Sequence, residues 1–391
     1  MGRVVIVGAG PAGAACALYP ARAGCQVTVL EAQRGIKSKV CGEGLMPAGA
    51  PVLADLGLLD GVLARGAIPF RGIRYRSPAG RSAVGEFPRW RAGVRGLAMP
   101  RVVLDGVFAD ALAAAPGVTV REGWLATEVL ADGDRVRGVR ARERDTAREE
   151  TLEADLTIGA DGLRSKLHAL PGVDARRPRR RRFGVNAHLT GVEGLGDVVE
   201  VHLIEGGELY LTPEGGDRAG LALILEEELL TDMGSPAKLF AQVLARADEL
   251  SRRCARAVLA DQPRVLGPLG LTVARACGPG WMLAGDAAGA LDPITGEGVA
   301  LALITARALG AQVQARGLVE AACAEALRHR HRTARELAVL TAALLYVSRS
   351  PRIADAAVWT VERLPFVFSR LLGIAAACPE PARAMAALGH A

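Results

Sequence analysis

Three glycines and one glutamate near the start of the chain have the types and spacing to bind a dinucleotide. Gly8, Gly10 and Gly13 form a Gly-x-Gly-x-x-Gly pattern, and Glu31 follows it after 18 residues. Along this pattern the glycines allow a tight turn, a close approach of backbone to pyrophosphate, and close packing of helix on strand. A carboxylate at the position of Glu31 accepts hydrogen bonds from ribose hydroxyls. The set therefore predicts a site for the ADP half of a dinucleotide.

A strand, a helix and a second strand must position these four residues. Residues 3–7 are a β-branched apolar run typical of a buried strand, 14–23 are an Ala-rich helical stretch, and 26–30 are a second strand. Pro11 and Ala12 stand at the turn into the helix, whose free N–H groups and positive dipole end would face the phosphates. This βαβ context favours dinucleotide binding over a merely structural glycine turn.

Two later segments add carboxylates at the ends of predicted strands. Asp161 follows an apolar run at 156–160, and Asp286 stands in a Gly-Asp pair after residues 281–284. The stretch 292–298, Asp-Pro-Ile-Thr-Gly-Glu-Gly, then forms a turn before a long apolar helix. Such a helix N-terminus stabilises negative charge at a bound ligand. The alternative is that both aspartates only cap loops.

Together these segments resemble the FAD-binding motifs of the para-hydroxybenzoate hydroxylase-like superfamily. This superfamily includes single-component flavin monooxygenases and geranylgeranyl reductases. The motifs are GAGPAG with its later glutamate, GADGLRS, and LAGDAAGALDPITGEG, and they span most of the chain. The resemblance implies FAD as the bound cofactor. The cofactor-binding residues that it implies are Gly8, Gly10, Pro11, Ala12, Gly13, Glu31, Arg101, Asp161, Gly285, Asp286, Gly296, Glu297 and Gly298.

The resemblance also implies a mixed α/β fold with a discontinuous domain organisation. A Rossmann-like FAD-binding domain would comprise residues 1–70, 97–172 and 268–320. Residues 71–96 and 173–267, which contain alternating strand patterns, would form a substrate domain built on an antiparallel sheet. Residues 321–391 would form a C-terminal helical region.

Several residues are candidates for the wall of the flavin and substrate pocket, although none can be assigned a catalytic role. Cys41, Gly42, Glu43 and Gly44 resemble a Cys-Gly-x-Gly segment of geranylgeranyl reductases, and the alternative is a glycine loop with a buried thiol. Pro293, at the turn before the apolar helix, is a further candidate. Polar residues on the predicted strands are candidate substrate contacts, namely Asn186, His188, His202 and Tyr210.

The resemblance implies an FAD-dependent oxidoreductase, with monooxygenation as the favoured reaction. NAD(P)H would dock transiently and reduce the flavin, because no second glycine-rich βαβ unit is visible. Dioxygen would then form a flavin C4a-hydroperoxide that hydroxylates or epoxidises a mostly apolar small molecule, free or carrier-bound. The alternative is a geranylgeranyl-reductase-like enzyme that reduces or dehydrogenates carbon–carbon double bonds. At the place of its Tyr-x-Trp-x-Phe-Pro pattern this chain keeps only Pro213, which counts against that alternative.

Composition argues against other classes of function. The formal net charge is +6, but only 4% of the residues are aromatic, which disfavours a nucleic-acid partner. The seven cysteines contain no Cys-x-x-Cys pair, so neither a disulfide framework nor a metal site is expected. We expect a cytoplasmic protein because the first residues show no signal peptide and no stretch is typical of a spanning helix. Peripheral membrane contact by the C-terminal helices is an alternative to their packing on the body.

Overall fold

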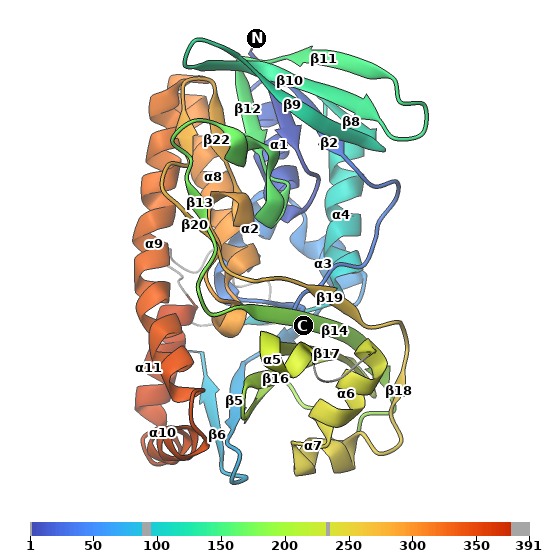
Figure 1. The fold of residues 1–391 in the computed structure, drawn as a ribbon, viewed down its shortest axis with the longest axis vertical. Helices are drawn as coiled ribbons and strands as arrows, with labels where there is room; N and C mark the ends of the chain where they lie inside the picture. Colours follow the sequence, from blue (N-terminus) through green and yellow to red (C-terminus); the bar gives the residue numbers. More distant parts are fainter. Residues whose placement is uncertain (1, 88–94, 232–234, 377–391) are drawn as a thin grey trace.

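The structure is a computed structural model that describes residues 2–87, 95–231 and 235–376 (Figure 1). Two large sheets lie at opposite ends of the elongated molecule, and the longest helix, α9 (Glu320–Val347), runs along one long side. The predicted mixed α/β fold, with a Rossmann-like part, an antiparallel sheet and C-terminal helices, is confirmed. The predicted domain boundaries stay predictions, and parts of four of their ranges, namely residues 1, 88–94, 232–234 and 377–391, lie outside the described residues.

The first sheet is mainly parallel and carries the glycine pattern. Its strands, in spatial order, are β21 (Cys277–Gly278), β22 (Trp281–Leu283), β12 (Leu156–Gly159), β1 (Arg3–Val7), β2 (Gln26–Glu31) and β8 (Val118–Glu122). Strand β1 is central, and its residues from Val4 to Val7 are buried because a helix and a smaller three-stranded sheet pack against the parallel sheet. The carboxyl ends of β1, β2, β12 and β22 therefore meet along one edge.

Helices and short sheets surround this parallel sheet. α1 (Pro11–Arg22) packs against α4 (Arg101–Ala114) and α8 (Gly298–Arg316). The three-stranded sheet β9 (Trp124–Asp132), β10 (Arg135–Glu143) and β11 (Glu149–Glu153) precedes β12. Shorter elements are β3 (Gly44–Leu45), η1 (Pro47–Gly49), α2 (Ala50–Asp55), α3 (Leu59–Ala64), β4 (Ile68–Phe70), β7 (Gly96–Ala98), η2 (Gly162–Arg164), η3 (Lys166–Ala169), β13 (Ala175–Arg176), β20 (Thr272–Val273), η4 (Gly285–Ala288) and η5 (Pro293–Thr295).

The second sheet is mainly antiparallel. Its strands, in spatial order, are β18 (Val258–Leu259), β14 (Arg182–Thr190), β17 (Arg218–Glu226), β16 (Gly207–Gly215), β15 (Val199–Ile204), β5 (Gly72–Arg76) and β6 (Ser82–Glu86), and β19 (Arg264–Leu266) also pairs with β14. One face packs with α6 (Pro236–Leu244) and α7 (Asp248–Arg253) into a separate apolar core, and α5 (Glu227–Thr231) follows β17.

Period-two alternation decides which side chains of this sheet reach the other face. Leu209 and Leu211 of β16 belong to the core beneath α6 and α7, whereas Tyr210 between them faces the first sheet. Val201 of β15 and Ala222 of β17 flank Tyr210 in register on the same face. The face toward the first sheet is therefore apolar around Tyr210.

The C-terminal helices close the remaining side. α10 (Pro351–Arg363) and α11 (Pro365–Ala375) pack against β6, and Phe368 of α11 makes an edge-to-face contact with Tyr75 of β5. In the described part of the chain, only α8 is long and apolar enough to cross a membrane. More than half of its apolar window is buried inside the protein, since α8 packs between α1 and α9.

Candidate functional site

The glycine pattern forms the turn from β1 into α1, and each glycine has its own reason to be there. Gly8 has φ of +102°, and a Cβ on it would come within 2.6 Å of the Ala160 carbonyl oxygen. A Cβ on Gly13 would overlap the carbonyl oxygen of Gly8, so Gly13 allows α1 to sit close to the turn. A Cβ on Gly10 would meet only the Arg101 guanidinium, at 3.6 Å. The open side of Gly10 is thus the side on which a phosphate can approach.

Glu31 ends β2 beside this turn. Its Oε2 accepts a hydrogen bond from the Ala9 amide at 3.1 Å, and its Oε1 accepts one from the Gln33 amide at 2.9 Å. These bonds aim the carboxylate at the cavity that the glycine turn opens onto. The position suits a ligand ribose, as the spacing predicts.

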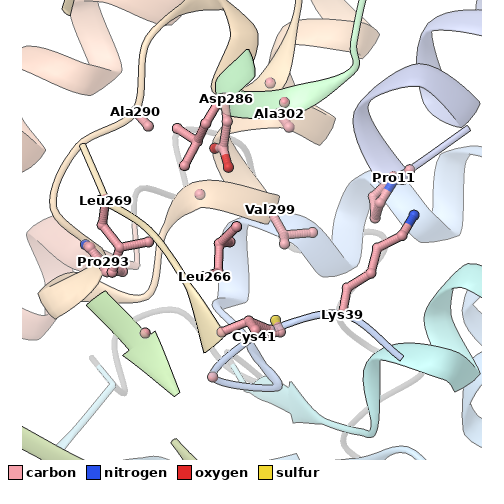
Figure 2. Close-up of a pocket in the computed structure, with 18 of the residues that line it drawn as sticks. Pro11, Lys39, Cys41, Leu266, Leu269, Asp286, Ala290, Pro293, Val299 and Ala302 are labelled. Carbon is pink, nitrogen blue, oxygen red and sulfur yellow. The ribbon is translucent and has the colours of Figure 1, made fainter. Parts of the chain in front are cut away.

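Asp286 lies across the cavity, at the N-terminus of α8. A Cβ on Gly298 would lie 3.7 Å from Asp286 Oδ1, so the carboxylate stands next to the first turn of that helix. The side chain is exposed to the open cavity, yet the protein around it raises its pKa by desolvation, with Arg330 and Arg101 opposing that rise. Figure 2 shows the carboxylate pointing into the cavity.

Arg330 is a site residue that sequence reasoning missed. It projects from α9 into the loop after Asp286, where its Nη2 donates to the carbonyl oxygens of Gly285, at 3.5 Å, and Gly289. The side chain is buried, and burial lowers its pKa while Asp286 works to raise it. Its sequence context, with His329 and His331 on either side in a polar stretch of helix, gave no signal of this role.

All these groups line one large cavity of about 760 Å³ between the two sheets. Figure 2 shows Asp286, Pro11 and Cys41 around it, with Val299 at the start of α8. Every predicted cofactor residue except Gly13 lines it, and Gly13 lies in the first turn of α1 beneath Gly10. The end facing the second sheet is mainly apolar, with Phe70, Ile73, Tyr75, Val199, Val201, Tyr210, Ala222, Ile224, Leu266 and Leu269.

Two contacts tie the predicted flavin loop to the second sheet. The Tyr210 hydroxyl donates to the carbonyl oxygen of Ile294 at 3.2 Å. Arg182 donates to Asp292 Oδ1 at 2.6 Å and is also bonded to Glu208, while Asp292 Oδ1 accepts from the Ile294 amide at 3.1 Å. The turn before α8 is thus fixed from the substrate side.

The Cys41–Gly44 segment forms part of the cavity wall between the two sheets. Cys41, Gly42 and Gly44 line the cavity, and Thr212 of β16 donates to the Gly42 carbonyl oxygen at 2.7 Å. Burial raises the pKa of the Cys41 thiol, with Arg101 opposing. Glu43, by contrast, buries its carboxylate behind the loop.

The predicted substrate contacts separate into different environments. Tyr210 and Pro293 line the cavity. Asn186 and His188 lie on the same face of the sheet as Tyr210 but behind the cavity wall, while His202 is on the opposite face, 3.5 Å from Glu200. The alternation of strands explains this difference, because His202 has the opposite parity to cavity-lining Val201 on β15.

The residues around the cavity fit FAD. The glycine turn leaves open backbone beside the α1 N-terminus for a diphosphate, and Glu31 and Asp286 offer carboxylates to ribose and ribityl hydroxyls. The α8 N-terminus, at Gly298, faces the same cavity and would stabilise negative charge on the flavin ring. An apolar space remains beyond these groups, against the second sheet.

Comparison with known proteins agrees with this site. Residues 1–205 match the model of the FAD binding domain family. The chain is 29% identical to the menaquinone reductase of Mycolicibacterium smegmatis, covering 80% of this chain and 76% of that protein. It is 30% identical to the digeranylgeranylglycerophospholipid reductase of Methanothrix thermoacetophila, covering 76% and 73%. A flavoprotein/dehydrogenase structure from Cytophaga hutchinsonii superposes with a TM-score of 0.83 at 19% identity, covering 96% of this chain and 92% of that one.

The family match covers more than half of the chain and includes the glycine turn, Glu31, Arg101 and Asp161, which line the cavity. The resemblance to the para-hydroxybenzoate hydroxylase-like superfamily is therefore confirmed, as is the prediction of an enzyme. The chain belongs to the FAD binding domain family of that superfamily and is an FAD-dependent oxidoreductase.

Proposed function

We propose that the protein reduces carbon–carbon double bonds in a long apolar substrate of the isoprenoid type. The observation that carries the proposal is the apolar end of the cavity, where Val199, Val201 and Ile224 face the flavin-binding loops. An isolated alkene in a hydrocarbon chain offers no polar group for recognition, so a substrate of this kind requires such walls. The two reductases reported above, similar over more than three quarters of this chain, support the same choice.

When bound and reduced by NAD(P)H, FAD would supply the hydride for such a reduction. The protein groups would hold the diphosphate at Gly10 and the α1 N-terminus, and the ribityl chain at Asp286. The apolar wall would exclude water, and Tyr210 would keep the turn at Ile294 fixed beside the substrate. Cys41 is the one thiol that lines the cavity in the described residues, and its raised pKa keeps it protonated at neutral pH. It is the candidate to donate the proton that completes the reduction.

Monooxygenation of an apolar molecule, the reaction that the sequence favoured, is the second candidate. The same dry cavity supports it, because exclusion of water protects reactive oxygen species. NAD(P)H as reductant and a cytoplasmic location belong to both proposals. Free cysteines throughout the described residues are consistent with a reducing compartment.

The experiment is an anaerobic incubation of the holoenzyme with dithionite or NADPH and a geranylgeranyl lipid, followed by mass spectrometry. Reduction adds two hydrogen atoms for each double bond and proceeds without dioxygen. Monooxygenation adds one oxygen atom and requires dioxygen. Cys41→Ser is the matched variant, since it keeps the size of the side chain and removes the thiol. Unchanged turnover in Cys41→Ser would exclude Cys41 as the proton donor.

A further inference from the structure

Glu43 has an unusual backbone for a glutamate. Its φ is +61°, in the left-handed region that side chains other than glycine rarely adopt, although glycines stand on both sides of it. Such strain persists only where the surroundings fix it, and it concentrates at functional sites. Glu43 is the middle of the loop whose neighbours Gly42 and Gly44 line the cavity.

The Glu43 side chain joins three parts of the structure. Its Oε1 accepts from the Arg101 amide at the start of α4, at 3.1 Å, and from His188 Nε2 on β14, at 2.9 Å. Its backbone carbonyl accepts from the Met99 amide at 2.9 Å. The loop is therefore fastened at once to the flavin-binding helix and to the substrate sheet.

His188 is itself oriented by a second carboxylate. Its Nδ1 lies 3.0 Å from Asp261 Oδ2, and its backbone amide donates to Asp261 Oδ1 at 2.9 Å. Arg264 holds Asp261 at 2.6 Å. The hydrogen bond with Glu43 is the main cause that raises the pKa of His188 to about 9, against its burial, so both ring nitrogens donate at neutral pH.

Glu214 of β16 completes the group. Its side chain is buried, and its Oε1 lies 3.5 Å from His188 Nε2. Burial, and then its contact with Glu43, raise the pKa of Glu214 to about 8, while His188 and Arg218 oppose the rise. At neutral pH the group thus holds a protonated Glu214 beside the His188 imidazolium, which lies between Glu43 and Asp261.

A glycine in the neighbouring strand leaves room for this cluster. Gly220 lies opposite His188 in register, and a Cβ on it would overlap Glu43 Oε2 and lie 3.0 Å from Glu214 Oε1. The absence of a side chain at Gly220 is therefore what lets both carboxylates reach the imidazole.

We propose that Glu43, His188, Glu214 and Asp261 form a buried acid–base cluster that fixes the Cys41–Gly44 loop against the flavin, with His188 as a positioning residue. Protons hold the cluster together, because the His188 imidazolium donates to both Glu43 and Asp261 and the proton on Glu214 removes a charge beside them. Loss of the Glu214 and His188 protons would leave the carboxylates facing one another, with Arg264 beside Asp261 and Arg218 near Glu214 as the cations, and the loop would be released. The inference rests on the proposed function only for its effect on turnover.

The primary test is a pH titration of the visible absorbance of the FAD-loaded protein without substrate. We expect a spectral transition between pH 8 and 9 in the wild type, where Glu214 and His188 lose their protons. In Glu43→Gln the transition should move to lower pH, because Glu43 is the main cause of the raised pKa of His188. Gly220→Ala should move it in the same direction, since it displaces the Glu43 carboxylate without removing a titratable group.

The matched control is His202→Gln, which changes another buried histidine paired with a glutamate, but on the opposite face of the same sheet. Its transition should coincide with that of the wild type. The proposal would be overturned if the transition in Glu43→Gln and Gly220→Ala occurred at the wild-type pH. It would also be overturned if His202→Gln moved the transition to the same pH as these variants. A shift on adding Zn²⁺ or EDTA would overturn it as well, since the three ligand atoms of Glu43, His188 and Glu214 would then hold a metal ion.

Turnover gives a second measurement. In His188→Gln we expect kcat to fall about 10- to 100-fold through misplacement of the loop, with an unchanged FAD dissociation constant. The spectral titration needs no substrate, so it tests the cluster even if the protein reduces no alkene. Conversely, alkene reduction with a wild-type titration in Glu43→Gln would sustain the proposed function and refute the cluster.

Discussion

Asp286→Ala offers the sharpest test of how the protein binds FAD. In the described residues no hydrogen bond from the protein occupies the Asp286 carboxylate, which faces the cavity beside the α8 N-terminus. Its acceptor capacity is thus available to a ribityl hydroxyl. A hydrogen bond to a charged group contributes roughly 1.5–3 kcal/mol, so the variant should raise the FAD dissociation constant about 10- to 150-fold.

The stability of the apoprotein should respond differently. Burial raises the pKa of Asp286, which means that ionisation of this group above its ordinary pKa destabilises the folded state. Asp286→Ala removes that cost at neutral pH, so the apoprotein should unfold at the same temperature or a higher one. Asp286→Asn, which keeps an acceptor oxygen, should lose less FAD affinity than the alanine variant.

The assay is titration of apoprotein with FAD, followed by flavin fluorescence, together with calorimetric unfolding of the same apoprotein. Weaker FAD binding in a protein of unchanged stability would locate the effect in the ligand contact. An FAD dissociation constant equal to that of the wild type would refute the assignment of Asp286, and a large fall in apoprotein stability would show that its role is structural.

Three further predictions follow from other parts of the structure. Gly10→Val should abolish FAD binding, because its side chain would occupy the open side of the turn; normal flavin content would contradict this. Gly298→Pro removes an N–H group at the α8 N-terminus, so potentiometry should show a lower flavin midpoint potential with FAD still bound; equal midpoints would mean that α8 does not face the flavin. Burial raises the pKa of Glu200, but its hydrogen bonds with His202 and Arg253 outweigh burial and lower the pKa to about 2. The stability that these contacts contribute is therefore lost as pH falls from 4.5 toward 2. Glu200→Gln should lose about 3 kcal/mol at pH 7 in denaturant unfolding and flatten that acid dependence; a wild-type profile would disprove the pairing.

The sequence predicted the turns and helix ends around the cavity well because their residues are close together along the chain. Gly8, Gly13 and Glu31 lie within one βαβ unit, where spacing along the chain fixes spacing in space. The Asp286 loop and the α8 N-terminus were found for the same reason, since turn, glycines and apolar helix are contiguous.

The second sheet was harder to interpret because its function depends on register. His188 and His202 both stand in strands whose side chains alternate between the two faces of the sheet. Only the pairing of the strands shows that His188 lies beside Glu43, whereas His202 lies beside Glu200 and α7. Arg330 could not be found at all, since its partners at Gly285 and Gly289 are more than 40 residues away along the chain. Glu43 was predicted as a pocket residue, but its left-handed backbone turns the carboxylate behind the wall.

The ring contact between Tyr75 and Phe368 connects the C-terminal helix α11 to the wall of the cavity. Tyr75 lines the cavity and its ring packs edge-to-face on Phe368, so α11 supports this part of the cavity wall from behind. None of the residues that would hold FAD lies on that helix. Changes at Phe368 would therefore move Tyr75 and the cavity wall without touching the residues that would hold FAD. The wall of the cavity at Tyr75 can thus vary through substitutions in α11 while the glycine turn and the Asp286 loop stay unchanged.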